Sequence, residues 1–393
     1  MLLLSTSPLW AMVNGFAALG LVAGVVVTRQ PEFFRLWALT KSDWGWVLFA
    51  AGLGGVLAYP VNRWVLAHWG SRSMLFRFGM AGGALLALVP WLPGFPGLLA
   101  GVFLQGVIYS GIGVATNHQG SEWELRQGQR VMGRLHATFF VGGVLSALLS
   151  ALLGTLGVSL AIHMAGVGLL AAWLHCSAAV SLRGAFPAIP AGADMAPRGI
   201  GEGRPLGFLF GWCMVLEGGV MGWASVYLNR ALGASEAVSG IGLAIFCGAM
   251  AIGRLLSDRL AARYGAATLV RAGAALCALS LGLAASLQQL PAAFLAFAAT
   301  GFGLAAAAPT VFSAAGRVSG DAVAFVAGMG AIGGLLGPLV LGRIASQLSL
   351  HWVLAALAAV GLVVAWQARA LAEPRPRPAA PPTPAIGSPH EPA

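Results

Sequence analysis

Charged side chains are scarce in this sequence. Asp, Glu, Lys and Arg make up 9% of its 393 residues, whereas a soluble domain carries roughly 25%. Hydrophobic residues make up 58% of the chain, and the mean hydropathy is +0.84. This composition excludes an ordinary soluble domain and indicates a protein that lies within a lipid bilayer.

Motifs of catalysis and of metal binding are also absent. The chain has no Walker loop, no G-x-S-x-G and no H-E-x-x-H, so we expect neither an enzyme nor direct drive by ATP. Its four cysteines, Cys176, Cys213, Cys247 and Cys277, fall in apolar segments without metal-ligand spacing. We therefore expect no cofactor, no metal site and no disulfide framework.

Twelve apolar segments reach membrane length, which is about 20 residues. No segment alternates as a β-strand does. The sequence therefore predicts an all-α polytopic membrane protein. The expected spans lie near residues 8–28, 43–66, 73–93, 96–120, 131–154, 157–180, 206–229, 236–261, 266–287, 291–314, 321–345 and 349–371.

A break in the apolar pattern divides the spans six and six. Residues 183–205 are rich in proline and glycine and are expected to form a cytoplasmic linker. It would join two six-helix bundles, formed by residues 1–182 and 206–372. Residues 373–393, which consist mainly of proline and small residues, are expected to be a disordered cytoplasmic tail.

The net charge of +10 follows the expected topology. With a cytoplasmic N-terminus, only five of the 22 Lys and Arg residues fall on the outer side: Arg29, Arg35, Lys41, Arg230 and Arg343. The others fall in cytoplasmic segments or at inner helix ends, as the positive-inside rule predicts. We therefore expect cytoplasmic N- and C-termini and no binding of nucleic acid.

A charged motif, G-R-L-L-S-D-R-L-A-A-R-Y-G, occupies residues 253–265 after span eight. Residues 58–70 repeat it in degraded form after span two, with Arg63 at the place of Asp258. With six plus six spans, this pattern resembles the major facilitator superfamily over nearly the whole chain. The resemblance implies two pseudo-symmetric bundles and transport by alternating access, with substrate near the midplane. It also implies a cytoplasmic gating motif, whose residues are Gly253, Arg254, Asp258, Arg259 and Arg317. We expect Asp258 to accept hydrogen bonds from the arginines of this set in one of the two states.

Two further stretches resemble a bacterial branch of this superfamily, which includes rhizopine-transport-like proteins and lies near the fucose permeases. They are G-V-A-T-N-H-Q-G at residues 113–120 with R-L-H at 134–136, and L-E-G-G through W-A-S-V-Y-L at 216–228. The chain departs from the branch at Gly113 and Gly222, where acidic residues are frequent. The resemblance implies a transporter of the bacterial inner membrane.

Glu217 is the strongest candidate for a functional group. It lies midway along the seventh span, and a charge at bilayer depth costs several kcal/mol. An ionisable group in such surroundings suits proton binding and release. The alternative is a hydrogen-bonded carboxyl that only tightens helix packing.

The fourth and fifth spans supply further candidates. Asn117 and Glu124 fall within about 60° on one helical face and could bind protons or a hydroxyl-bearing substrate. Glu124 could also be a solvated loop residue. His136, of a type that titrates near neutral pH, is a possible partner of Glu124 or a structural residue. Asn14 in the first span is a cavity donor or a packing residue.

Trp223 and Tyr227 are four residues apart and share a face of span seven. Such aromatic rings suit sugars and other ring compounds, and they are equally common as an interfacial belt. Together, these patterns predict a monomeric, proton-coupled secondary transporter of a small polar organic solute such as a sugar. Proton-driven efflux of drugs or metabolites is the alternative, followed by a non-transporting membrane receptor.

Overall fold

The computed structural model describes residues 7–128, 131–181 and 203–371. Helices make up nearly all of this part of the chain, and none of its residues is in a strand. The long helices are α1 (Pro8–Thr28), α3 (Lys41–Leu88), α4 (Gly94–Gln127), α5 (Met132–Thr155), α6 (Leu160–Ser181), α7 (Gly203–Arg230), α8 (Glu236–Tyr264), α9 (Ala266–Leu287), α12 (Gly320–Gln347) and α13 (Leu350–Gln367). Shorter elements are α2 (Gln30–Leu36), α10 (Leu290–Leu304), α11 (Ala307–Val318) and the 3-10 turns Val89–Trp91 and Ala368–Leu371.

The described residues contain 11 helical segments that are long and apolar enough to cross a membrane. One of them, Lys41–Trp91, has 51 residues and is long enough for two crossings. The chain reverses at Gly70, where the backbone has φ 72° and ψ 159°. After this turn it runs back along α4, so that Ser71 contacts Gln119 and Gly82 contacts Tyr109. The twelve expected spans are thus accounted for.

Gly265 makes the same kind of turn between α8 and α9, with φ 81° and ψ 146°. It aligns with Gly70 in the repeat, and these positive φ angles favour glycine. The charged motif at residues 253–265, expected after span eight, instead continues α8 as far as Tyr264. Only the glycine turns, since the arginine, leucine and alanine before it are good helix formers.

Two other boundaries differ from the expected ones. The span expected at 291–314 is divided between α10 and α11, since Pro309 has no N–H to bond the carbonyl of Ala305. Helix α7 begins at Gly203, so residues 203–205 are helical; Pro205 is tolerated there because it lies in the first turn. The rest of the expected linker and the expected tail lie outside the described residues.

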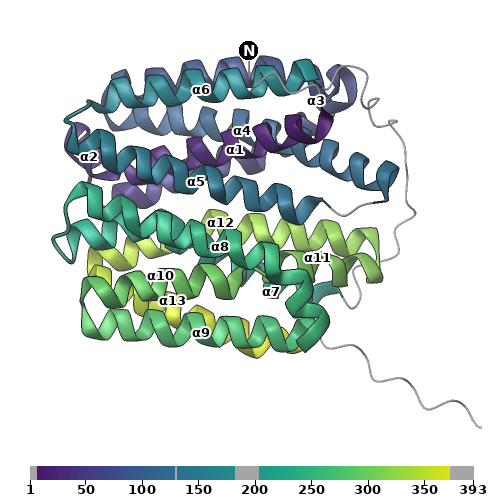
Figure 1. The fold of residues 1–393 in the computed structure, drawn as a ribbon. Coiled ribbons are helices and arrows are strands. Elements are labelled where there is room, and N and C mark those ends of the chain that lie inside the picture. The colour runs from purple at the N-terminus through teal and green to yellow at the C-terminus, as the bar shows by residue number, and fades with distance from the viewer. Residues whose placement is uncertain (1–6, 129–130, 182–202, 372–393) are drawn as a thin grey trace, which may run out of the picture.

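The helices form two halves, shown one above the other in Figure 1. The N half contains α1 to α6 and the C half contains α7 to α13. They meet chiefly where α5 packs on α8 and where α3 packs on α12. The second contact is close because Gly45 faces Gly342: a Cβ atom on Gly45 would lie 3.1 Å from the Cα of Gly342.

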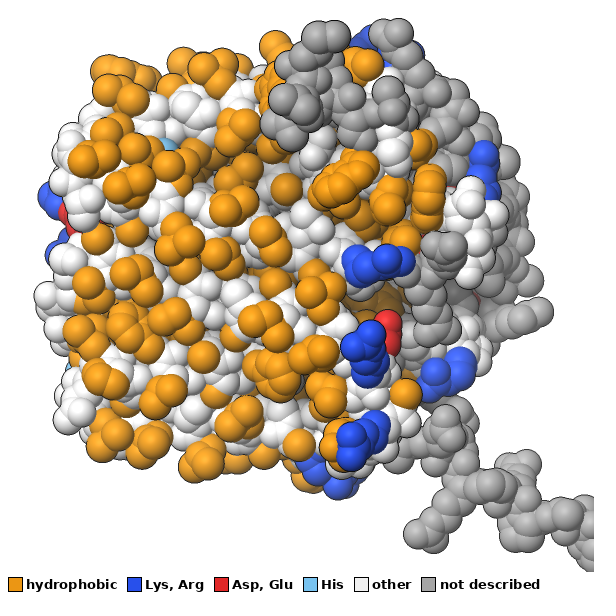
Figure 2. Space-filling model, in the orientation of Figure 1, with side chains coloured by type: hydrophobic (Ala, Val, Ile, Leu, Met, Phe, Trp, Pro, Cys, Tyr) orange, Lys and Arg blue, Asp and Glu red, His pale blue; other side chains and the backbone are white. Residues whose placement is uncertain are grey.

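The two ends of the bundle differ in charge. We call the end that carries Arg63, Arg72, Arg126, Arg259 and Arg317 the basic end, and the end that carries α2 the opposite end. Figure 2 shows a mostly apolar outer surface, with most of the Lys and Arg side chains in view near one edge.

Several close contacts between the halves lie towards the opposite end. Gly45 and Gly342 lie near this end, and so does Gly240 of α8, which faces Ala147 of α5. Near the basic end, a Cβ atom on Gly328 of α12 would meet no atom within 4 Å. The halves are therefore closed together at the opposite end.

Candidate substrate and proton site

A buried ion pair lies in the C half, on the side where α8 faces α5 of the N half. A terminal nitrogen of Arg254 in α8 is 3.5 Å from a carboxylate oxygen of Glu217 in α7, and the two side chains are 8% and 16% exposed. Both residues lie well inside their helices, so each charge is held among apolar neighbours. Each charge needs the other, because an unpaired buried charge is strongly unfavourable.

The pair also contacts the N half. The guanidinium carbon of Arg254 is 5.1 Å from the centre of the Phe140 ring in α5, which is a cation–π distance. His136, one turn away on α5, lies near enough for Arg254 to act on it electrostatically. Its ring packs edge-on against Phe16 of α1 at 5.1 Å between centroids. Helices α5 and α8 thus meet at Arg254, the partner of Glu217, and α1 packs on the same part of α5.

The Arg254 guanidinium has an N–H donor that is not used in a hydrogen bond within the described part of the chain. This donor is the Nε, which is buried. A guanidinium offers five N–H donors, and one carboxylate does not use them all. Arg254 therefore has more donors than the Glu217 carboxylate uses.

In this conformation Arg254, one of the expected gating residues, lies away from Asp258 and pairs with Glu217. The residue is buried and pairs with Glu217, and no bond to Asp258 is found among the described residues. Asp258, Arg259 and Arg317 are exposed near the basic end, whereas Gly253 packs tightly against Ala305. Arg254 precedes Asp258 by about one turn of α8 and is buried, whereas Asp258 is exposed.

Glu124 has a structural partner. One oxygen of its carboxylate accepts the backbone N–H groups of Val131 and Met132, at 2.6 and 2.8 Å. These are free donors of the first turn of α5, so Glu124 caps that helix. In this conformation Glu124 binds the start of α5 and the His136 ring packs on Phe16, which favours the alternative of a structural His136 over its pairing with Glu124.

The two asparagines lie near one helix crossing. Gly15 of α1 packs on Thr116 of α4, which brings the neighbouring Asn14 and Asn117 to this region. Both are partly exposed. The Asn117 amide donates to the carbonyl of Gly113 in its own helix at 2.8 Å, which leaves its oxygen available.

Trp223 and Tyr227 lie in the packed interior, with exposures of 1% and 0%. The Tyr227 hydroxyl donates to the carbonyl of Ala284 at 3.2 Å and is 3.3 Å from Nδ1 of His351. Trp223 packs beside Gly342, at the contact between the halves. In this conformation neither ring is open to a solute.

Sequence reasoning missed that Arg254 and Phe140 belong to the site. A signal was available for Arg254, because it lies within the expected span 236–261 with apolar residues on both sides. The argument applied to Glu217 applies equally to this residue. Phe140 carries no such signal, since phenylalanine is common throughout apolar helices.

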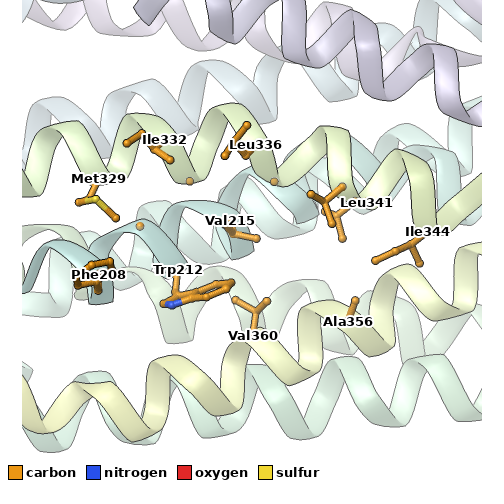
Figure 3. Close-up of a pocket in the computed structure, with 14 residues that line it drawn as sticks. Phe208, Trp212, Val215, Met329, Ile332, Leu336, Leu341, Ile344, Ala356 and Val360 are labelled. Carbon is orange, nitrogen blue, oxygen red and sulfur yellow. The ribbon is translucent and has the colours of Figure 1, made fainter. Parts of the chain in front are cut away.

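A cavity of about 410 Å³ lies between α7, α12 and α13, apart from the buried ion pair. Figure 3 shows Trp212 and Val215 of α7, Leu336 of α12 and Val360 of α13 around this gap. No charged side chain is among the described residues that line it. The residues that line this cavity offer no charged group to bind a proton or a charged solute, so the buried ion pair is the better candidate site.

Comparison with known proteins identifies the family to which the chain is similar. The family model of the Major Facilitator Superfamily matches residues 205–392. An uncharacterized MFS-type transporter of Yersinia pestis is 31% identical over 341 residues, which cover 85% of this chain and 88% of that protein. The finer resemblance to the rhizopine-transport-like branch stays a prediction.

Solved structures share the fold. The crystal structure of the nucleoside transporter NupG matches with a TM-score of 0.69 at 14% identity, over 93% of this chain and 99% of that one. A bacterial homolog of the human lysosomal transporter Spinster, in an inward-facing and occupied conformation, matches with a TM-score of 0.70 at 15% identity, over 92% and 96%.

Proposed function

This chain belongs to the major facilitator superfamily and is a secondary transporter, and we propose that it couples the movement of a small polar organic solute to protons. Sugars and sugar-like compounds are the first substrate class to test. Uptake by symport is the proposed direction. Glu217 is the proposed proton carrier, and Arg254 is its partner.

The buried pair of Glu217 and Arg254 carries this proposal. A carboxylate inside a membrane protein is costly to keep unless it has a function or a partner. Here the partner also touches Phe140 in the other half of the molecule. Protonation of Glu217 would remove the charge that holds Arg254, and would thereby alter a contact between the halves. Proton binding and the opening of the two halves would then be linked.

The charge distribution supports the proposed orientation. Arginines concentrate at the basic end, which is therefore assigned to the cytoplasm of a bacterium, with the protein in the inner membrane. The closed opposite end would then face outward, and this structure would represent an inward-facing state. Both termini would be cytoplasmic.

A binding screen followed by a flux measurement tests the proposal. Purified protein would be heated in the presence of sugars, polyols, organic acids and amphiphilic drugs, since a ligand that binds the native state raises the Tm. The stabilising compound would then be offered to proteoliposomes with an imposed pH gradient. Accumulation that depends on the gradient supports symport, and accumulation without any dependence on it excludes proton coupling. Stabilisation by amphiphilic drugs alone would favour efflux.

A further inference from the structure

A second cluster of buried charge lies at the opposite end, where α1 meets α2. The Nε of Arg29 is 2.7 Å from one carboxylate oxygen of Glu32, and these side chains are 4% and 13% exposed. Arg29 also donates to the carbonyl of Val158, at 2.5 Å. The other oxygen of Glu32 is buried and has no hydrogen-bond partner in the described residues.

Glu32 lies where protons can reach it. Helix α2 is not part of any segment that could span the membrane. A hollow of about 420 Å³ opens beside the carboxyl, and Arg35, Trp91 and Ser159 also line it. Glu32 is thus a largely buried acid at the edge of a cavity near the surface of the membrane.

Helix α2 also holds the two halves together. Arg35 forms an ion pair with Glu236, the first residue of α8 in the C half. Arg230 at the end of α7 lies over the ring of Phe34, 4.9 Å from its centre. Separation of the halves at this end must break both contacts and expose α2 to water.

Three charged groups act on the Glu32 carboxyl: Arg29 from α1, Arg35 from its own helix and Glu236 from α8. The positive charge of Arg29 also acts electrostatically on the imidazole of His163 in α6. Burial raises the pKa of Glu32 from its ordinary 4.5 to about 7, Arg29 opposes this rise, and Glu236 adds to it. Opening would take Glu32 away from Glu236 and into water, which removes both causes of the raised pKa.

We propose that Glu32 is a proton-binding site at the opposite end, and that a proton bound there keeps this end closed. The closed conformation binds the proton more tightly than an open one in which Glu32 is solvated. Proton binding therefore favours closure fully below pH 4.5, and this advantage is lost as the pH rises through about 7. The proposal does not depend on Glu217 and goes beyond the function of the central site.

Distance measurements test the proposal without a substrate. Spin labels would be placed at Leu156 in the N half and Leu348 in the C half, which are 67% and 63% exposed at the opposite end. The four native cysteines would first be replaced by serine, and the protein would be held in lipid nanodiscs. Between pH 5.5 and 8.5 we expect the ratio of closed to open molecules to fall by about tenfold or more, since a pKa difference of one unit corresponds to a factor of ten.

Variants assign the titration to one group. Glu32→Gln imitates the protonated acid and should stay closed over the whole pH range. The protein with Glu122→Gln, the same change in an ion pair with Arg126 near the basic end, should show the same pH-dependent change of the closed fraction as the unmodified protein. If Glu32→Gln does not fold, Glu236→Gln replaces it; removal of that negative charge should move the midpoint to lower pH.

Two results would overturn the proposal: a closed fraction that does not change with pH, or a titration in Glu217→Gln that persists when Glu32→Gln is added. The titration should persist in Glu217→Gln. A failure of proton-coupled transport at the central site can thus be distinguished from a failure at Glu32.

Discussion

The Arg254 guanidinium lies between the Glu217 carboxylate, at 3.5 Å, and the Phe140 ring, at 5.1 Å. It thereby connects α7 and α8 of the C half with α5 of the N half. A change of charge at Glu217 would act on a contact between the halves, which the proposed alternating access would have to remodel.

Replacement of Glu217 by glutamine tests coupling. Glutamine keeps the shape of the side chain but cannot carry a proton, so Glu217→Gln should abolish accumulation driven by a pH gradient. Exchange of substrate without a gradient should survive. Both rates would be measured in proteoliposomes, with Glu122→Gln as the matched control. Full gradient-driven accumulation in the variant would contradict the assignment.

Removal of Arg254 alone should destabilise the protein. Arg254→Met leaves Glu217 buried without a counter-ion, which costs about 3 kcal/mol or less, because Glu217 can instead take up a proton. The double variant with Glu217→Gln should recover part of the loss, since no charge is left unpaired. The Tm values of the two single variants and the double variant form the test. Additive losses would show that the two residues do not interact.

Asp258→Asn tests the gating motif. Asp258 is exposed, and the described residues offer it no ion pair in this conformation. If its partners are found only when the basic end closes, the variant should shift the population by roughly 5- to 150-fold towards the present conformation. Turnover should slow, while affinity for substrate from the basic end is kept. Cysteine labelling from the two sides would report the shift, and an unchanged ratio would rule the role out.

Gly106→Ala tests the close packing of α3 on α4. A Cβ atom on Gly106 would lie 1.9 Å from the carbonyl oxygen of Ala51, so the helices must move apart. Such overpacking typically costs about 1–3 kcal/mol. Gly166→Ala in α6 is the control, because a Cβ atom there meets nothing within 4 Å. The control should leave the Tm unchanged or raise it slightly, since alanine is the better helix former. Equal Tm values for the two variants would contradict the packing argument.

The helices themselves could be predicted from the sequence because a membrane span is a local property. About 20 apolar residues in succession must be helical in lipid, where every backbone group needs a partner within its own segment. The repeat could also be predicted, because Gly70 and Gly265 occupy matching positions in its two copies. Each of these glycines takes a positive φ in the structure. The boundaries at Gly203 and between α10 and α11 were missed, because the positions of Pro205 and Pro309 within a turn decide them.

The amino-acid sequence alone determined the twelve spans, the division into halves and the candidacy of Glu217, since each depends on residues close together in the chain. Only the tertiary structure decided that Arg254 pairs with Glu217, that Glu124 caps α5 and that α2 joins the halves through Arg35 and Glu236. The physical reason is that these helices are apolar on most sides. Their sequences therefore do not mark which face meets which neighbour, and the close approach of small residues in three dimensions sets those pairings.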